Sequence, residues 1–255
     1  QARVALRRLR TGLRIFRAHV PSRFAAHWSA EWKLLTNQLG DARNWDVFAT
    51  EWLPELLAGE QPASATVDGS TQAPERWVEQ QRRAAWQRAA EALGSREHAL
   101  RLLAFTRAVL CLQPADPAGE WSDGDGLAAW AQATLRERHA SLRQQARAAL
   151  RTGPEGRHAL RISLKKLRYA QEFLASVLPP KRVARSTAVL ADAQELLGRL
   201  NDLSSAHTLL ASMEAGPASV LVVHWQQSLD ARLQEGLLEL PSMEKALAKA
   251  PAPWG

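Results

Sequence analysis

The stretch RVALRRLRTGLRIF at residues 3–16 has a near copy, RISLKKLRYAQEF, at residues 161–173. The copies are offset by 161 − 3 = 158 residues, and a second motif pair, LGDARN from Leu39 and LGRLND from Leu197, has the same offset, 197 − 39 = 158. Chance matches would not keep the spacing between two separated motifs, so the shared offset indicates an internal duplication. We therefore predict two related halves, not a solenoid of short repeats.

Both copies have the period of an amphipathic helix with a basic face beside the apolar one. At about 100° per residue, the apolar and the basic side chains fall on two adjacent stripes. The first copy contributes the apolar residues Leu6, Leu9, Leu13 and Phe16 and the basic residues Arg3, Arg7, Arg10, Arg14 and Arg17. The second contributes Leu164, Leu167 and Leu174, and His158, Arg161, Lys165 and Arg168, while Glu172 replaces the cation that Arg14 supplies.

Like charges one turn apart destabilise an isolated helix by about 0.2–0.5 kcal/mol per pair, so a basic stripe suggests that an anion compensates. The alternative is a solvated basic surface shielded by nearby carboxylates, which is the commoner origin of a charge run. A second stripe at the duplicated position favours the anion.

The composition also favours anionic partners. Lys and Arg number 33 against 26 Asp and Glu, giving a net charge of +7 and a pI of about 10.3. Most of these cations are Arg, whose planar guanidinium matches phosphate oxygens in bidentate fashion. An Arg-rich codon bias is an equally ordinary cause.

Several classes of protein are disfavoured by what the sequence lacks. A single cysteine, Cys111, excludes an intramolecular disulfide framework and a cysteine zinc cluster. The seven histidines show no metal-binding spacing, and we find neither a phosphate-binding glycine loop nor a nucleophile motif. We therefore expect no enzyme, no metal and no cofactor. We also expect no membrane span, because no apolar run approaches about 20 residues. The single cysteine makes a cytoplasmic location the simplest expectation.

The apolar periodicity predicts an all-α chain. A polar loop is expected at residues 59–74 and a boundary between halves at 113–126, giving halves 1–112 and 127–255. The first expected helix runs from the start of the chain to about Val20, and the repeated basic helix of the second half ends at Leu178. The other expected helices lie at about 22–40, 44–57, 74–93, 95–112, 127–151, 181–198, 201–214, 217–237 and 241–250. On the helix at 127–151, one face carries Arg136, Arg143, Arg147 and Arg151.

The chain has ten Trp residues, and most lie in apolar helical patterns, where large rings fill bundle cores. We expect core positions for Trp28, Trp32, Trp45, Trp52, Trp86 and Trp130. None alternates with the basic stripes, which argues against binding of single-stranded nucleic acid.

The repeated basic helix, the histidine before its second copy and the two LG turns resemble the CHAD family, the conserved histidine α-helical domain. The residues that carry the resemblance are RVALRRLR at 3–10, LGDARNWDV at 39–47, HALRISLKKLRYAQEF at 158–173 and LGRLND at 197–202. The resemblance implies two pseudo-symmetric antiparallel helical bundles around a central basic channel. It also implies binding of inorganic polyphosphate and association with polyphosphate granules.

By this resemblance, the residues expected to line the channel are Arg3, Arg7, Arg8, Arg10, His158, Arg161, Lys165, Lys166 and Arg168. Arg8 and Lys166 point about 90° or more away from the basic stripe on an ideal helix. From the basic helical faces we add Arg14, Arg136, Arg143 and Arg147 to the candidate polyphosphate-binding residues. The chain starts at Gln1 inside a helical pattern and without Met, so we expect a piece of a longer product or a trimmed chain, and the first family histidine would precede Gln1. Asn44 stands where the family has Asp, as Asp202 does in the second turn.

The expected mechanism is electrostatic capture without cleavage, since two cationic stripes can hold a run of phosphate units whatever their order. Such binding weakens steeply with salt. Two alternatives stay open. The chain could be the accessory domain of a CYTH-type triphosphatase, whose own domain opens with an ExExK strand, or it could bind other polyanions, such as nucleic acid.

Overall fold

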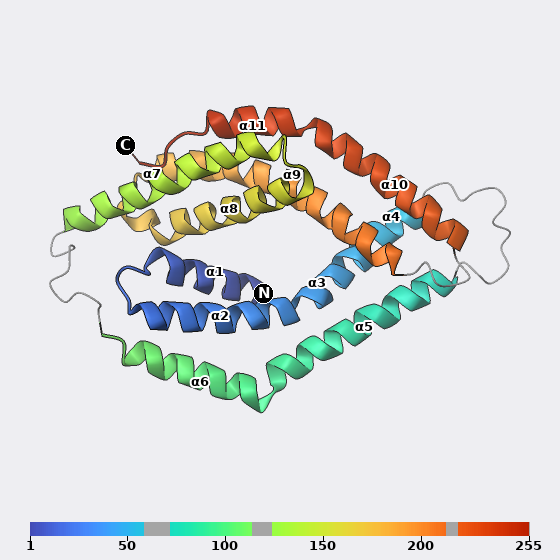
Figure 1. Ribbon diagram of the computed structural model, residues 1–255, viewed down its shortest axis with the longest axis horizontal. Helices are drawn as coiled ribbons and strands as arrows, with labels where there is room; N and C mark the ends of the chain where they lie inside the picture. The colour runs from blue at the N-terminus through green and yellow to red at the C-terminus, as the bar shows by residue number, and fades with distance from the viewer. Residues whose placement is uncertain (59–71, 114–123, 213–218, 255) are drawn as a thin grey trace. The chain divides into compact units, whose positions relative to one another are not determined.

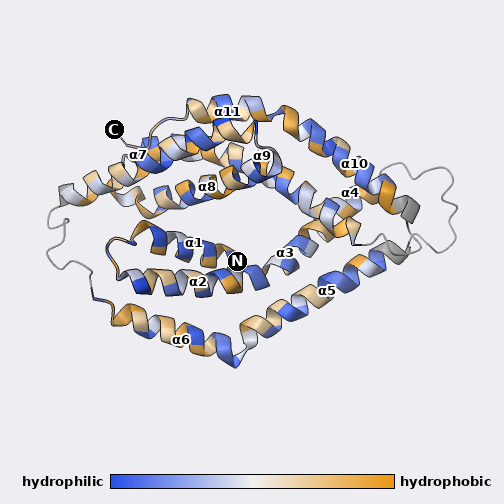
Figure 2. Ribbon diagram, viewed as in Figure 1, coloured by the Kyte–Doolittle hydropathy of each residue, from blue (hydrophilic) through white to orange (hydrophobic). Residues whose placement is uncertain are grey.

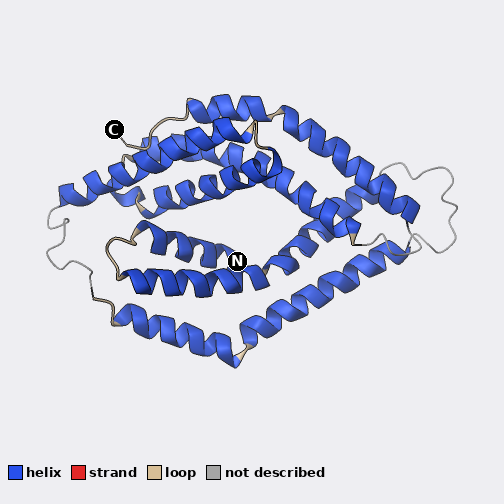
Figure 3. Cartoon of the chain, viewed as in Figure 1, coloured by secondary structure: helices blue, strands red, loops and turns tan. Residues whose placement is uncertain are grey.

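The computed structural model describes residues 1–58, 72–113, 124–212 and 219–254. Within these ranges the regular secondary structure is helical and no strand occurs, which confirms the all-α prediction (Figure 3). Polar and apolar residues alternate around most helices, as expected for helices that bury one face (Figure 2). The predicted polar loop at 59–74 and the predicted boundary at 113–126 lie largely outside the described residues.

The chain forms two compact units, each built from segments far apart in the sequence. Unit 1 comprises Gln1–Lys33, Ala108–Arg199 and Leu238–Gly255, and unit 2 comprises Leu34–Arg107 and Leu200–Leu237. Each unit thus takes residues from both predicted halves. The division into halves at 1–112 and 127–255 rests on the repeated motifs and stays a prediction.

Unit 1 contains α1 (Ala2–Ile15), most of α2 (Ser22–Gln38), α7 (Gly124–Ala149), α8 (Gly153–Phe173), a 3-10 turn (Ala175–Val177), the first part of α9 (Pro180–Ala211) and α11 (Leu240–Ala248). Unit 2 contains α3 (Gly40–Val47), a π-helical turn (Phe48–Trp52), α4 (Leu53–Ala58), α5 (Gln72–Gly94), most of α6 (Arg96–Leu110), the end of α9 and most of α10 (Ser219–Leu238).

Helix α8 is the centre of unit 1, lying between α7 and α1 (Figure 1). Its buried stripe includes Leu160, Leu164 and Leu167, each at most 1% exposed, in the spacing of one helical face. Gly153 joins α7 to α8 with a φ of 64°, a left-handed conformation that glycine adopts without steric cost. This turn sets α7 and α8 side by side, and the basic side chains of α8 flank its buried stripe.

The burial pattern recurs with the offset of the repeated motifs. Helix α1 ends at Ile15 and α8 at Phe173, while α2 begins at Ser22 and α9 at Pro180, which is 158 residues in both cases. Buried residues also pair at this offset: Trp32 with Leu190, Leu35 with Ala193, Leu39 with Leu197, Ala42 with Leu200, Trp45 with Leu203, Phe48 with Ala206, and Trp52 with Leu210. An internal duplication predicts this recurrence. The first copy has aromatic residues at several positions where the second copy has Leu or Ala.

Several predicted helix limits are wrong. The first helix ends at Ile15, not near Val20. The predicted helices at 181–198 and from 201 onward are one helix, α9, up to Ala211, and the end of the second prediction lies outside the described residues. Gly198 does not break α9, because a glycine costs a helix only about 1 kcal/mol and the buried stripe continues through Leu197 and Leu200.

The expectation that Trp86 is a core residue is also wrong. Its side chain is 50% exposed, and its Nε1–H donates a 2.7 Å hydrogen bond to the carboxylate of Asp46. Trp28, Trp32, Trp45 and Trp52 are buried, as predicted, and Trp130 is half-buried. A polar partner at the helix surface explains why Trp86 follows an apolar periodicity without being enclosed.

Candidate anion-binding site

Helix α1 buries a narrower face than its sequence period indicates. Leu6, Thr11 and Ile15 are buried, whereas the predicted apolar residues Leu9 and Leu13 are half-buried. The neighbouring arginines are therefore partly enclosed. The Nε atoms of Arg7 and Arg10 are buried and have no hydrogen-bond partner among the described residues, so each of these guanidinium groups retains unused donor capacity.

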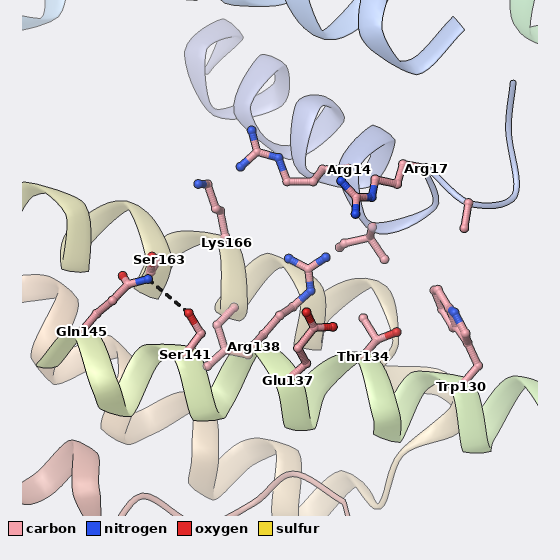
Figure 4. A pocket seen from close by; sticks show the side chains of 13 residues that line it. Arg14, Arg17, Trp130, Thr134, Glu137, Arg138, Ser141, Gln145, Ser163 and Lys166 are labelled. Carbon is pink, nitrogen blue, oxygen red and sulfur yellow. Dashed lines mark hydrogen bonds between the residues drawn. The ribbon is translucent and has the colours of Figure 1, made fainter. Parts of the chain in front are cut away.

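A cavity of about 410 Å³ opens where α1, α7 and α8 meet in unit 1. Four cationic side chains line it, namely Arg14 in the last turn of α1, Arg17 in the turn that follows α1, Arg138 on α7 and Lys166 on α8 (Figure 4). None of the four forms an ion pair with a carboxylate in the described part of the chain. Glu137 is the carboxylate among the lining residues. We call these four residues the cation cluster.

The cations of the cluster repel one another when no ligand is bound. The pKa of Lys166 is lowered, first by burial and then by the positive charges of Arg14, Arg138 and Arg10. The pKa of Arg138 is also lowered, mainly by burial, and the repulsion from Arg14 and Arg17 adds to this effect while Glu137 opposes it. An anion bound in the cavity would relieve both the repulsion and the lost hydration.

Uncharged polar groups and an apolar wall complete the cavity. Thr134, Ser141, Gln145 and Ser163 provide hydroxyl and amide groups, and the amide of Gln145 donates a 3.2 Å hydrogen bond to the hydroxyl of Ser141 (Figure 4). The apolar part consists of Ile15, Ala18, Trp130 and Leu167. Charged and neutral hydrogen-bond donors around one hollow suit a ligand with many acceptor oxygens.

Arg8 on α1 and Lys166 on α8 are equivalent positions of the repeat. Lys166 belongs to the cation cluster, whereas Arg8 lies outside it. The guanidinium of Arg8 is 3.1 Å from the carboxylate of Glu172 and lies over the rings of Tyr169 and Phe173, at 6.0 and 5.8 Å. Glu172 also lies 3.6 Å from Arg168. These two predicted ligand-binding cations therefore share one carboxylate in the free protein.

The predicted arginines of α7 are also separate from the cluster. Arg136 lies over the ring of Trp254 at 5.7 Å, and Arg143 donates a 3.1 Å hydrogen bond to the carbonyl of Ala250. Arg147 borders a different hollow of about 650 Å³ together with Arg143 and Arg151. Arg136 and Arg143 lie on one side of the buried stripe of α7, and Arg138 lies on the other. The chain end with Ala250 and Trp254 thus covers part of the predicted basic face.

The other predicted residues lie on the two repeated helices outside the cavity lining. Arg3, Arg7 and Arg10 are half-buried on α1, Arg161 and Lys165 are half-buried on α8, and His158 is exposed. Of the candidate residues, the structure thus brings Arg14 and Lys166 into the cavity and places Arg10 beside them, since its charge lowers the pKa of Lys166.

Two members of the cluster, Arg17 and Arg138, were absent from the candidate set. The run of arginines at 136, 143 and 147 marks a different face of α7 from the one that carries Arg138. The polar residues Thr134, Arg138, Ser141 and Gln145 recur at the spacing of one helical face, and this pattern would have indicated a second functional surface.

Metal-binding and membrane-spanning features do not occur in the part of the chain that the structure describes. No group of three or more His, Cys, Asp or Glu side chains there could hold a metal ion. None of the described helices combines the length and apolar character that crossing a membrane requires.

Comparisons with known proteins agree with the helical fold. A crystal structure of the CHAD domain from the plant Ricinus communis is similar, with a TM-score of 0.77 and 26% identity over 98% of this chain and 81% of the other. PptA from Streptomyces chartreusis shares the fold, with a TM-score of 0.68 and 18% identity over 95% of this chain and 87% of the other. No curated protein matches in sequence. The family model of the CHAD domain matches residues 1–211, and the chain therefore belongs to the CHAD domain family.

Proposed function

We propose that this CHAD domain binds inorganic polyphosphate and does not cleave it. The observation that carries the proposal is the cation cluster, in which four cations from three helices and the turn after α1 converge without a carboxylate ion pair in the described part of the chain. A surface that serves only solubility keeps its charges apart or pairs them, because desolvated like charges destabilise the fold. This cost is offset when a polyanion binds.

The chemistry of polyphosphate fits this arrangement. Each internal unit carries about one negative charge and presents acceptor oxygens in several directions, so guanidinium groups can bind without reading a sequence. Arg7 and Arg10 extend the cationic surface along α1, with buried Nε atoms that lack a hydrogen-bond partner in the described structure. A phosphate chain running along α1 would meet successive guanidinium donors one helical turn apart.

The aromatic residues favour polyphosphate over single-stranded nucleic acid. Trp130, which borders the cavity, is stacked on Phe16 at a centroid distance of 5.4 Å and has His19 against it at 5.2 Å. Its ring is thus used within the protein, whereas proteins that bind single strands display aromatic rings for the bases. Polyphosphate should accordingly displace RNA from the protein at equal phosphate concentration, and RNA should not displace polyphosphate.

A salt titration of polyphosphate affinity tests the proposal. The Arg14→Ala, Arg138→Ala, Lys166→Ala triple variant should lose most of its affinity. Its salt slope should fall by about two, because each lost phosphate contact removes about 0.7 for a single-stranded polymer. The matched control replaces three exposed lysines of the same unit, Lys181, Lys245 and Lys249, by Ala and should stay close to the parent. Equal losses in the two variants would show that net charge alone attracts the polymer.

The protein should leave the polymer intact. We expect that incubation with long polyphosphate releases no phosphate and leaves the chain-length distribution on a gel unchanged, with or without divalent cations. Shortening of the chains by the parent, and not by the triple variant, would contradict the non-catalytic part of the proposal.

A further inference from the structure

The cavity that holds the cation cluster is bounded by aromatic and apolar residues at the end of α1. Phe16, the first residue after α1, stacks on Trp130, and Ile15 and Ala18 add to the wall. In the close-up, Trp130 lies at the opposite end of the lining from Lys166 (Figure 4). A phosphate chain that follows Arg7 and Arg10 along α1 towards Arg17 therefore meets an apolar wall, which offers its oxygens no partner.

The cavity is also small. Its volume of about 410 Å³ corresponds to about a dozen water molecules, since each water occupies about 30 Å³ of liquid. A phosphate unit adds one phosphorus and three oxygen atoms, so the cavity holds about three or four units. The last few units of a polymer therefore fit in this space.

The distribution of charge matches the end of a chain better than its interior. A terminal phosphate has a second ionisable oxygen, whose pKa in phosphate monoesters is about 6, so it carries close to two negative charges at neutral pH. Arg14, Arg17, Arg138 and Lys166 surround this space, whereas Arg8 and Arg168 outside it share the carboxylate of Glu172. Four cations and one carboxylate, Glu137, thus lie where the additional charge of a chain end would be, which leaves an excess of positive charge there.

We propose that the cation cluster binds the end of a polyphosphate chain, with the terminal phosphate beside Arg14, Arg17 and Arg138 and the following units leading out past Lys166 and Arg10. This inference rests on the proposed function and specifies which part of the polymer the cavity takes. Arg17 distinguishes the two modes of binding, because it lies at the walled end of the cavity and would contact only the terminal units.

The test compares long polyphosphate chains with free ends and the same chains with both ends capped as phosphoramidates, at one salt concentration. Capping changes the total charge of a long chain very little but removes the terminal ionisation. The parent protein should bind capped chains about tenfold or more weakly, the loss expected for hydrogen bonds to a charged group. The number of protein molecules bound per free-ended chain should stay near two when the chain is lengthened.

Two variants make the test specific to the cavity. Arg17→Ala should bind free-ended and capped chains equally well while retaining most of the parent's affinity for capped chains. The control Arg23→Ala removes an exposed arginine at the start of α2 and should keep the preference for free ends. Equal binding of both chains by the parent, with a stoichiometry that grows with length, would overturn this inference and leave the proposed function standing. Absence of binding to either chain would instead reject the proposed function.

Discussion

The carboxylate of Glu172 on α8 lies 3.1 Å from the guanidinium of Arg8 on α1 and 3.6 Å from that of Arg168 on its own helix. Glu172 stands where the first copy of the repeat has Arg14, a member of the cation cluster. The same position of the repeat thus supplies a cation of the cluster in one copy and an internal counter-ion in the other. A bound polyanion must compete with this carboxylate for Arg8 and Arg168.

Replacing Glu172 by Gln should strengthen polyphosphate binding. The change frees two guanidinium groups and removes a negative charge near the ligand, and an exposed ion pair of this kind is worth about 0.2–1 kcal/mol, so affinity should rise up to about fivefold. Calorimetric titration at low salt measures the effect. Glu155→Gln, an exposed carboxylate in the first turn of α8, is the matched control and should change the affinity less. Identical gains in both variants would assign the effect to net charge.

Replacing Lys166 by Gln should stabilise the free protein while weakening its binding of polyphosphate. Burial and the charges of Arg14, Arg138 and Arg10 lower the pKa of Lys166, which means that its charged form is disfavoured in the folded state. We expect a gain of about 0.5 kcal/mol, or about 1–2 °C in melting temperature for a chain of this size. Thermal unfolding without ligand checks this, and the gain should shrink at high salt. A lower melting temperature at low salt would contradict the electrostatic account.

The stability of the protein should fall below neutral pH in part because of His139. This residue is 3% exposed against the ring of Trp254, and burial, followed by the charge of Arg143, lowers its pKa. The unfolded chain therefore takes up this proton first, at a pH of about 6.5, and stability decreases as the pH falls further until the folded pKa is passed.

Urea unfolding at pH 7.5 and pH 5 measures this contribution. The loss attributable to one group is at most about 1.4 kcal/mol per pH unit. His139→Leu should lose less stability between the two pH values than the parent, whereas His27→Leu, which alters an exposed histidine on α2, should lose as much. The same pH dependence in all three proteins would exclude His139 as the cause.

In unit 2, Asp46 should hold α5 against α3. Its carboxylate accepts a 3.0 Å hydrogen bond from Nε of Arg82 and a 2.7 Å bond from Nε1 of Trp86, and the first of these raises the pKa of Arg82. Asp46→Ala should cost about 1 kcal/mol in the free energy of unfolding, since it removes two hydrogen bonds whose donors water can reach. Asp41→Ala, an exposed carboxylate 4.0 Å from Arg88, should cost less than about 0.5 kcal/mol. Equal losses of stability in the Asp46→Ala and Asp41→Ala variants would show that Asp46 does not hold the two helices together.

The amino-acid sequence was sufficient to predict the helical class, the two repeated basic helices and the family. Periodicity carries this information because a helix places every third or fourth residue on one face, so the spacing of Leu160, Leu164 and Leu167 along the chain already marks them as one apolar stripe. The offset of 158 also indicated which buried residues correspond, as Trp32 and Leu190 show. Helix ends were harder to predict, because a glycine such as Gly198 ends a helix only where the buried stripe does not continue past it.

Which cations act together depends on the tertiary packing. The charges of Arg8 and Lys166 look equivalent on a helical projection, but Arg8 pairs with Glu172 whereas Lys166 shares a cavity with Arg14 and Arg138. Arg138 belongs to a helix with no repeated motif, and it comes to line one cavity with Arg14 and Arg17 because α7 and α1 both pack against α8. Electrostatic interaction depends on distance and burial between helices, and a one-dimensional pattern contains neither.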